Sequence, residues 1–330
     1  MKVLVSGGAG YIGSHAAWKL LERGNEVLVL DSLELGHQET VDKFKEKFPG
    51  KVSFQKLDLK DREAVLAASE EWREVEAVIH FAAYSQVGES VKAPEKYYRN
   101  NVLGTLNLLE TLVEKGIKRL VFSSTAATYG MPSVEFITEE TETKPINPYG
   151  ASKLMVERIL EDFWTAHGFS SVRLRYFNVA GALKTGEIGE KHDPETHLVP
   201  LVLKTALGQR ESVTIFGEDY ETPDGTCIRD YIHVEDLIDA HLLALDWLSK
   251  NTGTDYMNLG TRGGSSVKEI IDLCKKVSGV DFKVEKGERR AGDPPRLVAD
   301  SSKAKKVLGW EPKRSLEEII QSAWNWHRKN

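Results

Sequence analysis

Short runs of apolar, mostly β-branched residues alternate with segments of helical periodicity through the first half of the chain. The helical segments repeat apolar residues every three or four positions, as Ile12, Ala16 and Leu20 do, which buries one stripe of a helix. The runs that predict strands are Lys2 to Ser6, Glu26 to Leu30, Val52 to Leu57, Ala77 to Phe81, Leu120 to Ser124 and Val172 to Arg175. Strands that alternate with helices in this way predict an α/β fold with a doubly wound parallel sheet, which binds ligands at the carboxyl ends of its strands.

This alternation loosens beyond about residue 177, where glycines and prolines interrupt it. We therefore expect a sheet domain over residues 1–176 and a smaller C-terminal α/β domain over residues 177–330. Helical periodicity from Ile232 to Leu248 predicts a helix, and a segment near residues 232–257 is expected to complete the first domain. Ser315 and Glu318 have the spacing of a capping box, which predicts that the last helix begins there.

The composition is that of an ordinary globular chain. Its 330 residues are 41% apolar and 28% charged, with a formal net charge of -6. Charged or polar residues interrupt every apolar stretch before the roughly 20 residues that a membrane span needs, and no apolar leader follows Met1. We therefore expect a cytoplasmic protein with no membrane partner. The acidic balance argues against nucleic acid as a partner, and the two cysteines allow at most one disulfide.

Three glycines, Gly7, Gly10 and Gly13, lie where the first predicted strand turns into the first helix. The first glycine of such a turn allows its tight bend, the second lets a pyrophosphate approach the backbone, and the third lets the helix pack on the strand. The amides and the dipole at the start of that helix favour phosphate groups. Asp31 ends the second strand, where a carboxylate binds the ribose hydroxyls of NAD and repels the 2′-phosphate of NADP. The pattern predicts a Rossmann-type domain that binds NAD.

Three later strand ends extend the predicted cofactor site. The positions of these strand ends along the chain predict contacts with the adenine, the pyrophosphate and the nicotinamide, in that order. The residues are Asp58 and Leu59, then Phe81, Ala82 and Ala83, then Ser123, Ser124 and Thr125.

Tyr149 and Lys153 are four residues apart at a predicted helix start, and therefore lie on one face of that helix. A phenol has a reference pKa of about 10 and is a poor base at neutral pH. The charge of Lys153, together with that of a nicotinamide, would favour the phenolate. Thr125 supplies a hydroxyl that shares the substrate's proton and steadies a carbonyl oxygen as charge develops on it. We therefore expect Thr125, Tyr149 and Lys153 to be the catalytic residues.

These motifs resemble the extended short-chain dehydrogenase/reductase superfamily, and further motifs resemble one family within it, the UDP-glucose 4-epimerases. The resemblance runs from the first strand to the last helix. The narrower motifs are Val87-Gly-Glu-Ser90, Asn100-Asn-Val-x-Gly-Thr105, Arg175-Tyr-Phe-Asn178, Arg229-Asp-Tyr-Ile-His-Val234 and Arg289-Arg-x-Gly-Asp293.

The resemblance implies the interconversion of UDP-galactose and UDP-glucose through a 4-keto sugar. Tyr149 would take the proton of the sugar's 4-hydroxyl while a hydride passes from C4 to tightly bound NAD. The keto sugar would then rotate, and the hydride would return to its opposite face. The nucleotide must accordingly be held firmly and the hexose loosely.

Carried over position by position, the resemblance also implies the contacts of each ligand. The residues expected at NAD are Gly7, Gly10, Tyr11, Ile12, Gly13, Asp31, Ser32, Asp58, Leu59, Phe81, Ala82, Ala83, Ser85, Asn101, Ser123, Tyr149, Lys153, Tyr176 and Phe177. Those expected at the UDP-hexose are Ser85, Thr125, Tyr149, Asn178, His197, Leu198, Thr214, Phe216, Arg229, Arg290 and Asp293. Arginine suits the diphosphate because its planar fork binds two oxygens and keeps its proton.

Four positions depart from the commonest family pattern. Thr125 stands where many relatives have serine. Ser85 stands where some have lysine, and Thr196-His197-Leu198 stands where some have Asn-Asn-Leu. Leu297 occupies the position that borders the sugar's 2-substituent, where a bulky aromatic side chain excludes N-acetyl sugars and a small one admits them. UDP-glucose and UDP-galactose are favoured, and epimerases of UDP-N-acetylglucosamine, UDP-glucuronate or UDP-pentoses stay open as alternatives.

Two other functions are less compatible with the residues around Thr125 than epimerisation is. A nucleotide-sugar 4,6-dehydratase needs an acid and a base, Asp-Glu, directly after the catalytic threonine, whereas Ala126 and Ala127 follow Thr125 here. A non-catalytic NAD-sensing module would have no need of Thr125, Tyr149 and Lys153.

No metal site is expected, because His192 and His197 lie in an irregular stretch without an obvious set of carboxylate partners. The resemblance implies a homodimer through two helices of the first domain, Asn101 to Glu114 and Tyr149 to Phe163.

Overall fold

The computed structural model describes residues 1–290 and 293–330. Two compact units make up the chain. The first comprises Met1–Gly130, Thr143–Arg175 and Ile238–Met257, and the second comprises Met131–Glu142, Tyr176–Leu237 and Asn258–Asn330. The short segment Met131–Glu142, which lies within the range expected for the first domain, is part of the second unit.

A seven-stranded sheet forms the centre of the first unit, and it confirms the expected α/β class. The strands follow the order β11-β6-β5-β4-β1-β2-β3, and the pairings from β3 across to β6 are parallel. Their bounds are β1 (Lys2–Ser6), β2 (Glu26–Asp31), β3 (Val52–Lys56), β4 (Val75–His80), β5 (Arg119–Ser123), β6 (Ser170–Tyr176) and β11 (Thr254–Leu259). The order reverses direction between β1 and β4, which is where a doubly wound sheet binds its ligand.

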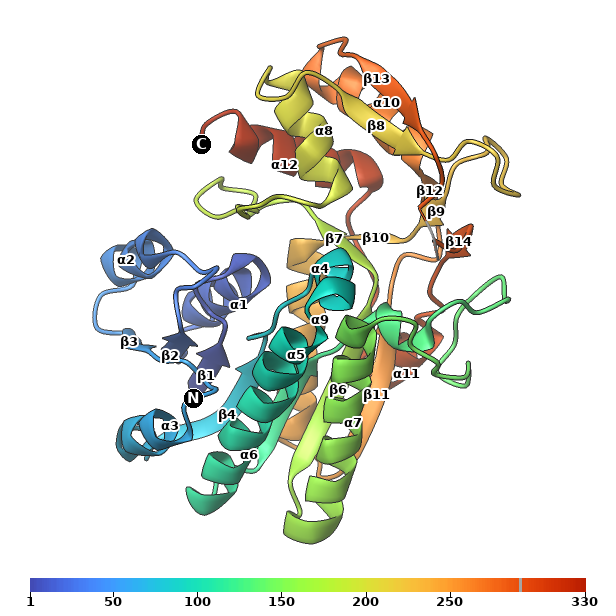
Figure 1. The fold of residues 1–330 in the computed structure, drawn as a ribbon. Coiled ribbons are helices and arrows are strands. Elements are labelled where there is room, and N and C mark those ends of the chain that lie inside the picture. Colours follow the sequence, from blue (N-terminus) through green and yellow to red (C-terminus); the bar gives the residue numbers. More distant parts are fainter. Residues whose placement is uncertain (291–292) are drawn as a thin grey trace. The chain divides into compact units, whose positions relative to one another are not determined.

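The helices of the first unit cover both faces of this sheet. On one face α1 (Tyr11–Glu22) lies beside α9 (Val234–Leu248), since Lys19 and Asp239 approach to 3.7 Å. On the other face α6 (Gly104–Glu114) and α7 (Pro148–His167) lie side by side (Figure 1). The remaining helical segments are α2 (Gln38–Lys47), α3 (Arg62–Ala68), η1 (Ser69–Glu71), α4 (Val87–Lys92), α5 (Pro94–Tyr97), η2 (Tyr98–Leu103) and η3 (Ala126–Tyr129).

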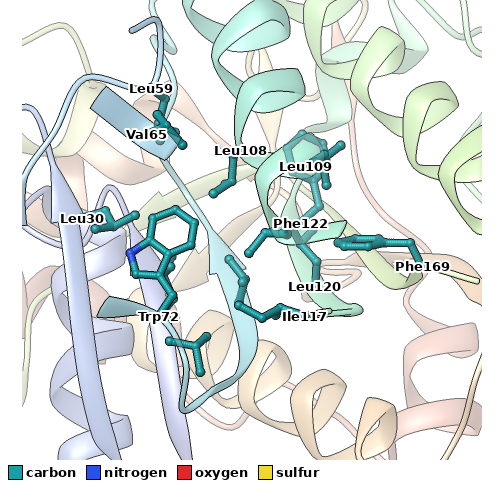
Figure 2. Close-up of a cluster of buried hydrophobic side chains, with 14 of the residues drawn as sticks. Leu30, Leu59, Val65, Trp72, Leu108, Leu109, Ile117, Leu120, Phe122 and Phe169 are labelled. Atoms are coloured by element: carbon teal, nitrogen blue, oxygen red, sulfur yellow. The ribbon is translucent and has the colours of Figure 1, made fainter. Parts of the chain in front are cut away.

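Strand alternation explains the core under α6 and α7. Leu4, Leu28 and Leu30 point to this face, because successive side chains of a strand point to opposite sides of a sheet. Figure 2 shows Leu30 and Trp72 on one side of this cluster, with Leu108, Leu109, Phe122 and Phe169 on the other. Burial of these side chains stabilises the sheet whose carboxyl ends carry the site.

The described part of the second unit combines short sheets of two or three strands with four helices of its own. Its strands are β7 (Asn178–Ala180) with β10 (Tyr231–His233), β8 (Val213–Phe216) with β13 (Val284–Gly287), and β9 (Ile228–Arg229) between β12 (Ser265–Ser266) and β14 (Arg296–Leu297). Its helices are α8 (Leu198–Ala206), α10 (Val267–Ser278), α11 (Ser302–Leu308) and α12 (Leu316–His327). The apolar faces of α8, α10 and α12 pack together through residues such as Val202, Ile270 and Ile320.

Two helix starts test the sequence patterns directly. The capping box at Ser315 and Glu318 is present, and α12 begins after it as predicted. The helix expected from Ile232 begins at Val234 instead, because Ile232 and His233 pair with β7 as part of β10. Within the described residues, no helix combines the length and the apolarity that crossing a membrane requires.

Candidate active site

The turn from β1 to α1 is built around glycine. Gly7 has a φ of +74°, and a Cβ there would lie 2.6 Å from the backbone nitrogen of Ala82. A Cβ at Gly13 would lie 2.1 Å from the carbonyl oxygen of Gly7. At Gly10 the nearest atom would be 3.5 Å away, an ordinary contact. The fold itself therefore requires glycine at positions 7 and 13, whereas the open backbone at Gly10 is the cradle that an approaching pyrophosphate needs.

Asp31 lies beside this turn, at the end of β2. Its carboxylate oxygens accept hydrogen bonds of 2.9 Å from the backbone N–H groups of Ala9 and Leu33. Burial raises the pKa of Asp31, although these hydrogen bonds oppose the shift. A glycine cradle with a carboxylate at the next strand end has the donor and acceptor set of a dinucleotide site, and it fits NAD.

The other predicted strand ends lie along the same edge of the sheet, since parallel strands place their carboxyl ends together. Phe81 and Ala82 donate backbone hydrogen bonds of 2.9 and 3.1 Å to the carbonyl oxygen of Ser6, which holds this segment against the glycine turn. Asp58 follows β3 and approaches Lys60 to 3.4 Å. The other predicted cofactor residues on this edge are Tyr11, Ile12, Ser32, Leu59, Ala83 and the exposed Ser85.

Asn101 serves the architecture of this edge. Its buried amide accepts a 2.9 Å hydrogen bond from the backbone nitrogen of Tyr84 and donates to the carbonyl oxygen of Tyr84 and the hydroxyl of Ser152, each at 3.0 Å. It therefore links the segment after β4 to helix α7. A cofactor contact of Asn101 stays a prediction, and these hydrogen bonds show how its side chain is held.

Thr125 and Tyr149 are brought together in the first unit. The side chain of Asn147 caps α7 by accepting a 2.8 Å hydrogen bond from the Gly150 nitrogen. A Cβ at Gly150 would lie 2.4 Å from the carbonyl oxygen of Ala127, so glycine lets the start of α7 approach the segment after β5. The phenol of Tyr149 is hydrogen-bonded to the Thr125 hydroxyl; burial raises the pKa of Tyr149, and this hydrogen bond partly opposes the rise.

Lys153 lies one helical turn after Tyr149 and is buried. Its ammonium donates a 2.8 Å hydrogen bond to the carbonyl oxygen of Ser123 and lies 4.8 Å from the centre of the Phe122 ring. Burial lowers the pKa of Lys153 to about 7, although the charge of Glu157 raises it. A lysine with this pKa exchanges its proton near neutrality, as proton-transfer chemistry requires.

Glu157 and Arg175 form a buried pair that the sequence analysis did not identify as part of the site. The Arg175 Nε donates to the two Glu157 carboxylate oxygens at 2.9 and 3.2 Å, and the Ser124 hydroxyl donates to Glu157 at 2.5 Å. The pairing raises the pKa of Arg175 although burial lowers it. The available signal was the four-residue spacing of Tyr149, Lys153 and Glu157, which places all three on one face of a helix.

His80 is a second residue that the sequence analysis missed. Its Nδ1 lies 2.5 Å from the Ser6 hydroxyl and its Nε2 lies 2.8 Å from the Thr105 hydroxyl. Thr105 donates its own hydrogen to the carbonyl oxygen of Asn101, so we assign the proton to His80 Nε2 and the acceptor role to Nδ1. Burial lowers the pKa of His80 to about 3, and the charge of Lys153 adds to this. A neutral His80 thus connects the end of β1 to η2 and α6.

In the second unit the predicted phosphate and nucleoside residues form two contacts. The Arg229 guanidinium donates to the Asp293 carboxylate at 3.1 Å and to the Pro294 carbonyl oxygen at 2.8 Å. The Arg290 guanidinium lies 4.0 Å from the centre of the Phe216 ring. Gly292, part of the motif that ends in Asp293, lies outside the described residues. Asp293, expected at a ribose, is therefore also the ion-pair partner of Arg229.

The remaining predicted residues lie on other elements of the second unit. Tyr176 ends β6, Phe177 follows it, Asn178 begins β7, Thr214 lies in β8 and Leu198 begins α8. His197 precedes α8, where its Nδ1 lies 3.0 Å from oxygens of both Glu190 and Glu195. The expectation that His192 and His197 lack carboxylate partners is wrong, because the loop before α8 folds back and brings two glutamates to them.

The comparisons with known proteins agree with this geometry. A family model described as GDP-mannose 4,6 dehydratase matches residues 4–323. The UDP-glucose 4-epimerase of Lactobacillus helveticus is 51% identical, with 100% of this chain and 98% of the relative covered.

Two solved structures are similarly close. The UDP-Glc/GlcNAc 4-epimerase from Campylobacter jejuni is 45% identical, with a TM-score of 0.87 and coverage of 100% and 99% of the two chains. The UDP-glucose 4-epimerase from Bifidobacterium longum, in complex with NAD+ and UDP, is 39% identical, with a TM-score of 0.95 and coverage of 100% and 99%. The resemblance inferred from the sequence motifs is confirmed. The chain belongs to the UDP-glucose 4-epimerases, within the wider family that the GDP-mannose 4,6 dehydratase model describes.

Proposed function

We propose that this chain is an isomerase that interconverts UDP-galactose and UDP-glucose, with NAD as its bound cofactor. The observation that carries the proposal is the hydrogen-bonded pair of Thr125 and Tyr149 one helical turn before the buried Lys153. This set lies at the sheet edge that also holds the glycine turn and Asp31. The relatives that carry the same fold bind NAD+ and UDP or act on UDP-glucose, which supports this assignment.

The residues of the first unit divide the proton chemistry among them. When bound, NAD supplies the oxidant that C4 of the sugar needs and a positive charge beside the phenol. Tyr149 accepts the proton of the 4-hydroxyl and later returns it, while Lys153 stabilises the phenolate by its charge. The single hydroxyl hydrogen of Thr125 is donated to the phenolic oxygen or to the oxygen on C4, whichever carries more negative charge at that point of the cycle. The Ser123 carbonyl holds Lys153 in place for this role.

The residues after Thr125 distinguish this function from dehydration. Elimination of water needs an acid and a base beside the sugar, and Ala126 and Ala127 offer neither. The dehydratase name of the family model therefore describes the wider family. The NAD-sensing alternative is disfavoured because it gives no reason to hold a buried lysine one turn from a hydrogen-bonded phenol.

For the UDP part of the substrate, we assign the diphosphate to Arg229 and Arg290 and the nucleoside to the edge of β8, at Thr214 and Phe216. Arginine binds phosphate through two parallel hydrogen bonds. The contacts of Arg229 with Asp293 and Pro294 hold its side chain in one orientation before the nucleotide arrives. Asn178, His197 and Leu198 are proposed to complete the pocket, and the second oxygen of Asp293 is assigned to the ribose.

Leu297 is the residue expected at the sugar's 2-substituent, and its size lies between that of the aromatic side chains that exclude N-acetyl sugars and that of the small ones that admit them. It lies in β14 and pairs with Arg229 of β9. The pairing holds Leu297 next to Arg229, which is expected at the diphosphate. Leucine is smaller than an aromatic side chain, and the 45% identical Campylobacter jejuni relative is a UDP-Glc/GlcNAc 4-epimerase. UDP-glucose and UDP-galactose are the proposed main substrates, and UDP-N-acetylhexoses are the second candidates.

We also propose that the enzyme is a cytoplasmic homodimer formed through α6 and α7. Leu103 and Met155 lie on or beside these helices and expose 41% and 46% of their surface. Large exposed apolar residues on neighbouring helices favour association with a second copy.

The test of the function is an incubation of the purified protein with UDP-galactose and no added cofactor, followed by NMR. We expect UDP-glucose to form, because NAD stays bound through the cycle. If the sugar stays unchanged even after NAD is added, the proposal is wrong.

A further inference from the structure

A cluster of two histidines and two glutamates lies in the loop between β7 and α8 of the second unit. His192 Nδ1 lies 3.3 Å from a Glu190 oxygen and 3.6 Å from a Glu195 oxygen. His197 Nδ1 lies 3.0 Å from oxygens of both glutamates. One ligand atom from each residue lies within 4.8 Å of those of the other three. The loop therefore gathers two imidazole nitrogens and two carboxylate oxygens around one point.

The spacing of these atoms is that of a tetrahedral metal shell. Zinc binds imidazole nitrogen and carboxylate oxygen at about 2.0–2.1 Å, so its ligand atoms lie about 3.3–3.4 Å apart at the corners of a tetrahedron. The nitrogen-to-oxygen distances of 3.0 to 3.6 Å bracket that value, with His192 nearest to Oε2 of Glu195 and His197 nearest to Oε1. The side chains therefore need only small shifts to accept an ion.

Burial gives a second reason for an ion at this point. The Glu190 and Glu195 side chains are only 4% and 2% exposed. Within the described part of the chain, Glu195 Oε2 has no hydrogen-bond donor at normal distance, and its ion-pair partner His192 Nδ1 lies 3.6 Å away. A buried carboxylate is costly unless it is paired or bound to a metal. Binding of an ion would displace the protons from both imidazoles, and the two carboxylates would then balance the charge of one divalent cation.

The elements around the loop hold the cluster in place. The Trp326 indole of α12 donates a 3.2 Å hydrogen bond to the Glu190 carbonyl oxygen. The Trp326 ring also lies so close to Gly189 that a Cβ there would be 2.3 Å from it. At the other end, His197 is the residue before α8. The ligands are thus fixed between two packed helices, as the preorganisation of a metal site requires.

We propose that Glu190, His192, Glu195 and His197 bind one divalent transition-metal ion, with zinc the best fit. Imidazole nitrogen favours zinc over magnesium and calcium, which prefer oxygen ligands only. Four protein ligands fill a tetrahedral shell and leave no position for a substrate, so the ion is structural. It fixes the loop that leads into α8. This inference shares His197 with the proposed UDP pocket, but its test involves neither NAD nor a UDP-sugar, so the two proposals can fail separately.

The test is a metal-binding measurement on the untagged full chain after treatment with a chelator. We expect one Zn²⁺ per chain by elemental analysis, and with Co²⁺ the strong visible absorption bands of a tetrahedral site. His192→Gln and Glu195→Gln should each weaken the binding of Zn²⁺ by at least about 100-fold. His167→Gln, at the end of α7 in the first unit, is the matched control and should bind as the wild type does.

Two results would overturn the proposal. The first is a folded wild-type chain that retains neither Zn²⁺ nor Co²⁺. The second is zinc binding of unchanged strength in His192→Gln. Should the variants fail to fold, the Co²⁺ spectrum of the wild type still decides, because an octahedral, weakly absorbing spectrum would contradict a four-ligand protein site.

Discussion

On α7, Glu157 lies one helical turn beyond Lys153; burial lowers the pKa of the lysine to about 7, and the negative charge of the glutamate limits this fall. Both side chains are almost completely buried. The proton on Lys153 therefore depends on a residue that is assigned no contact with substrate. Glu157 is in turn held by Arg175 through hydrogen bonds of 2.9 and 3.2 Å.

Removing the Glu157–Arg175 pair should change the pH dependence of turnover. In Glu157→Gln combined with Arg175→Met, the pKa of Lys153 falls below about 7 because burial then acts unopposed. We expect kcat at neutral pH to fall by about 10-fold or more, and the alkaline limb of the kcat profile to move to lower pH, with KM little changed. The double variant is used because Glu157→Gln alone leaves a buried arginine unpaired, at about 3–5 kcal/mol.

A matched pair provides the control: Glu161, on the next turn of the same helix, approaches Arg173 of β6 to 2.7 Å. Glu161→Gln combined with Arg173→Met should keep the wild-type pH profile. Equal profiles for all three proteins would contradict a role of Glu157 in setting the charge of Lys153.

His80 should make the fold less stable in mild acid. Its folded pKa of about 3 lies below the unfolded value of 6.5, so the stabilising contribution is complete above 6.5 and is lost as the pH falls toward 3. Over this window only the unfolded chain takes up the proton, and the free energy of unfolding should fall by about 1.4 kcal/mol per pH unit from this residue.

Urea denaturation of the wild type and of His80→Gln, at about pH 7 and about pH 5, isolates this contribution. The variant should be less stable at the higher pH and should lose less stability between the two. A parallel loss in both proteins would show that His80 titrates normally in the folded state.

Leu297→Tyr should narrow the substrate range. A larger side chain next to the 2-substituent excludes an acetamido group by overlap, whereas a hydroxyl still fits. We expect kcat/KM for UDP-N-acetylglucosamine to fall by at least about 10-fold more than kcat/KM for UDP-glucose. Equal losses on the two sugars would mean that Leu297 does not border the 2-substituent.

The substitutions Leu103→Glu and Met155→Glu together should disrupt the proposed dimer. The two positions lie on exposed parts of the α6 and α7 region, and a charge there opposes burial against a second copy. Light scattering after gel filtration should give the mass of one chain for the double variant and of two for the wild type. Met131→Glu, on an equally exposed apolar residue of the second unit, should remain dimeric, and a monomeric wild type would refute the proposal.

The sheet, the glycine turn and the capping box of α12 could be predicted because each depends on local periodicity or spacing. Thr125, Tyr149 and Lys153 could be predicted as a set for a related reason. Two of them share a helix face, and the third follows a strand of the same sheet. The residues expected at the UDP site came from the family resemblance. They are dispersed along the sequence without a regular spacing, so no pattern of their own predicts the site.

The supporting contacts could not be predicted, because they join residues far apart in sequence. His80 binds Ser6 across 74 positions, and Glu157 binds Arg175 across 18. The expectation that His192 lacked carboxylate partners failed for a different reason. An irregular loop has no periodicity from which to infer that it folds back on itself. The contacts of His192 with Glu190 and Glu195 could therefore not be predicted.

The most direct test of the central claim is the fate of the hydrogen on C4 when UDP-galactose is converted in D₂O. We expect UDP-glucose with no deuterium at C4, because that hydrogen leaves as a hydride and returns without exchanging with solvent. Tyr149→Phe should bind UDP but convert the sugar at least about 1,000-fold more slowly, since it lacks the group that takes the proton. Deuterium at C4 would contradict the return of the same hydride, and unchanged turnover by Tyr149→Phe would contradict the role of Tyr149 as the base.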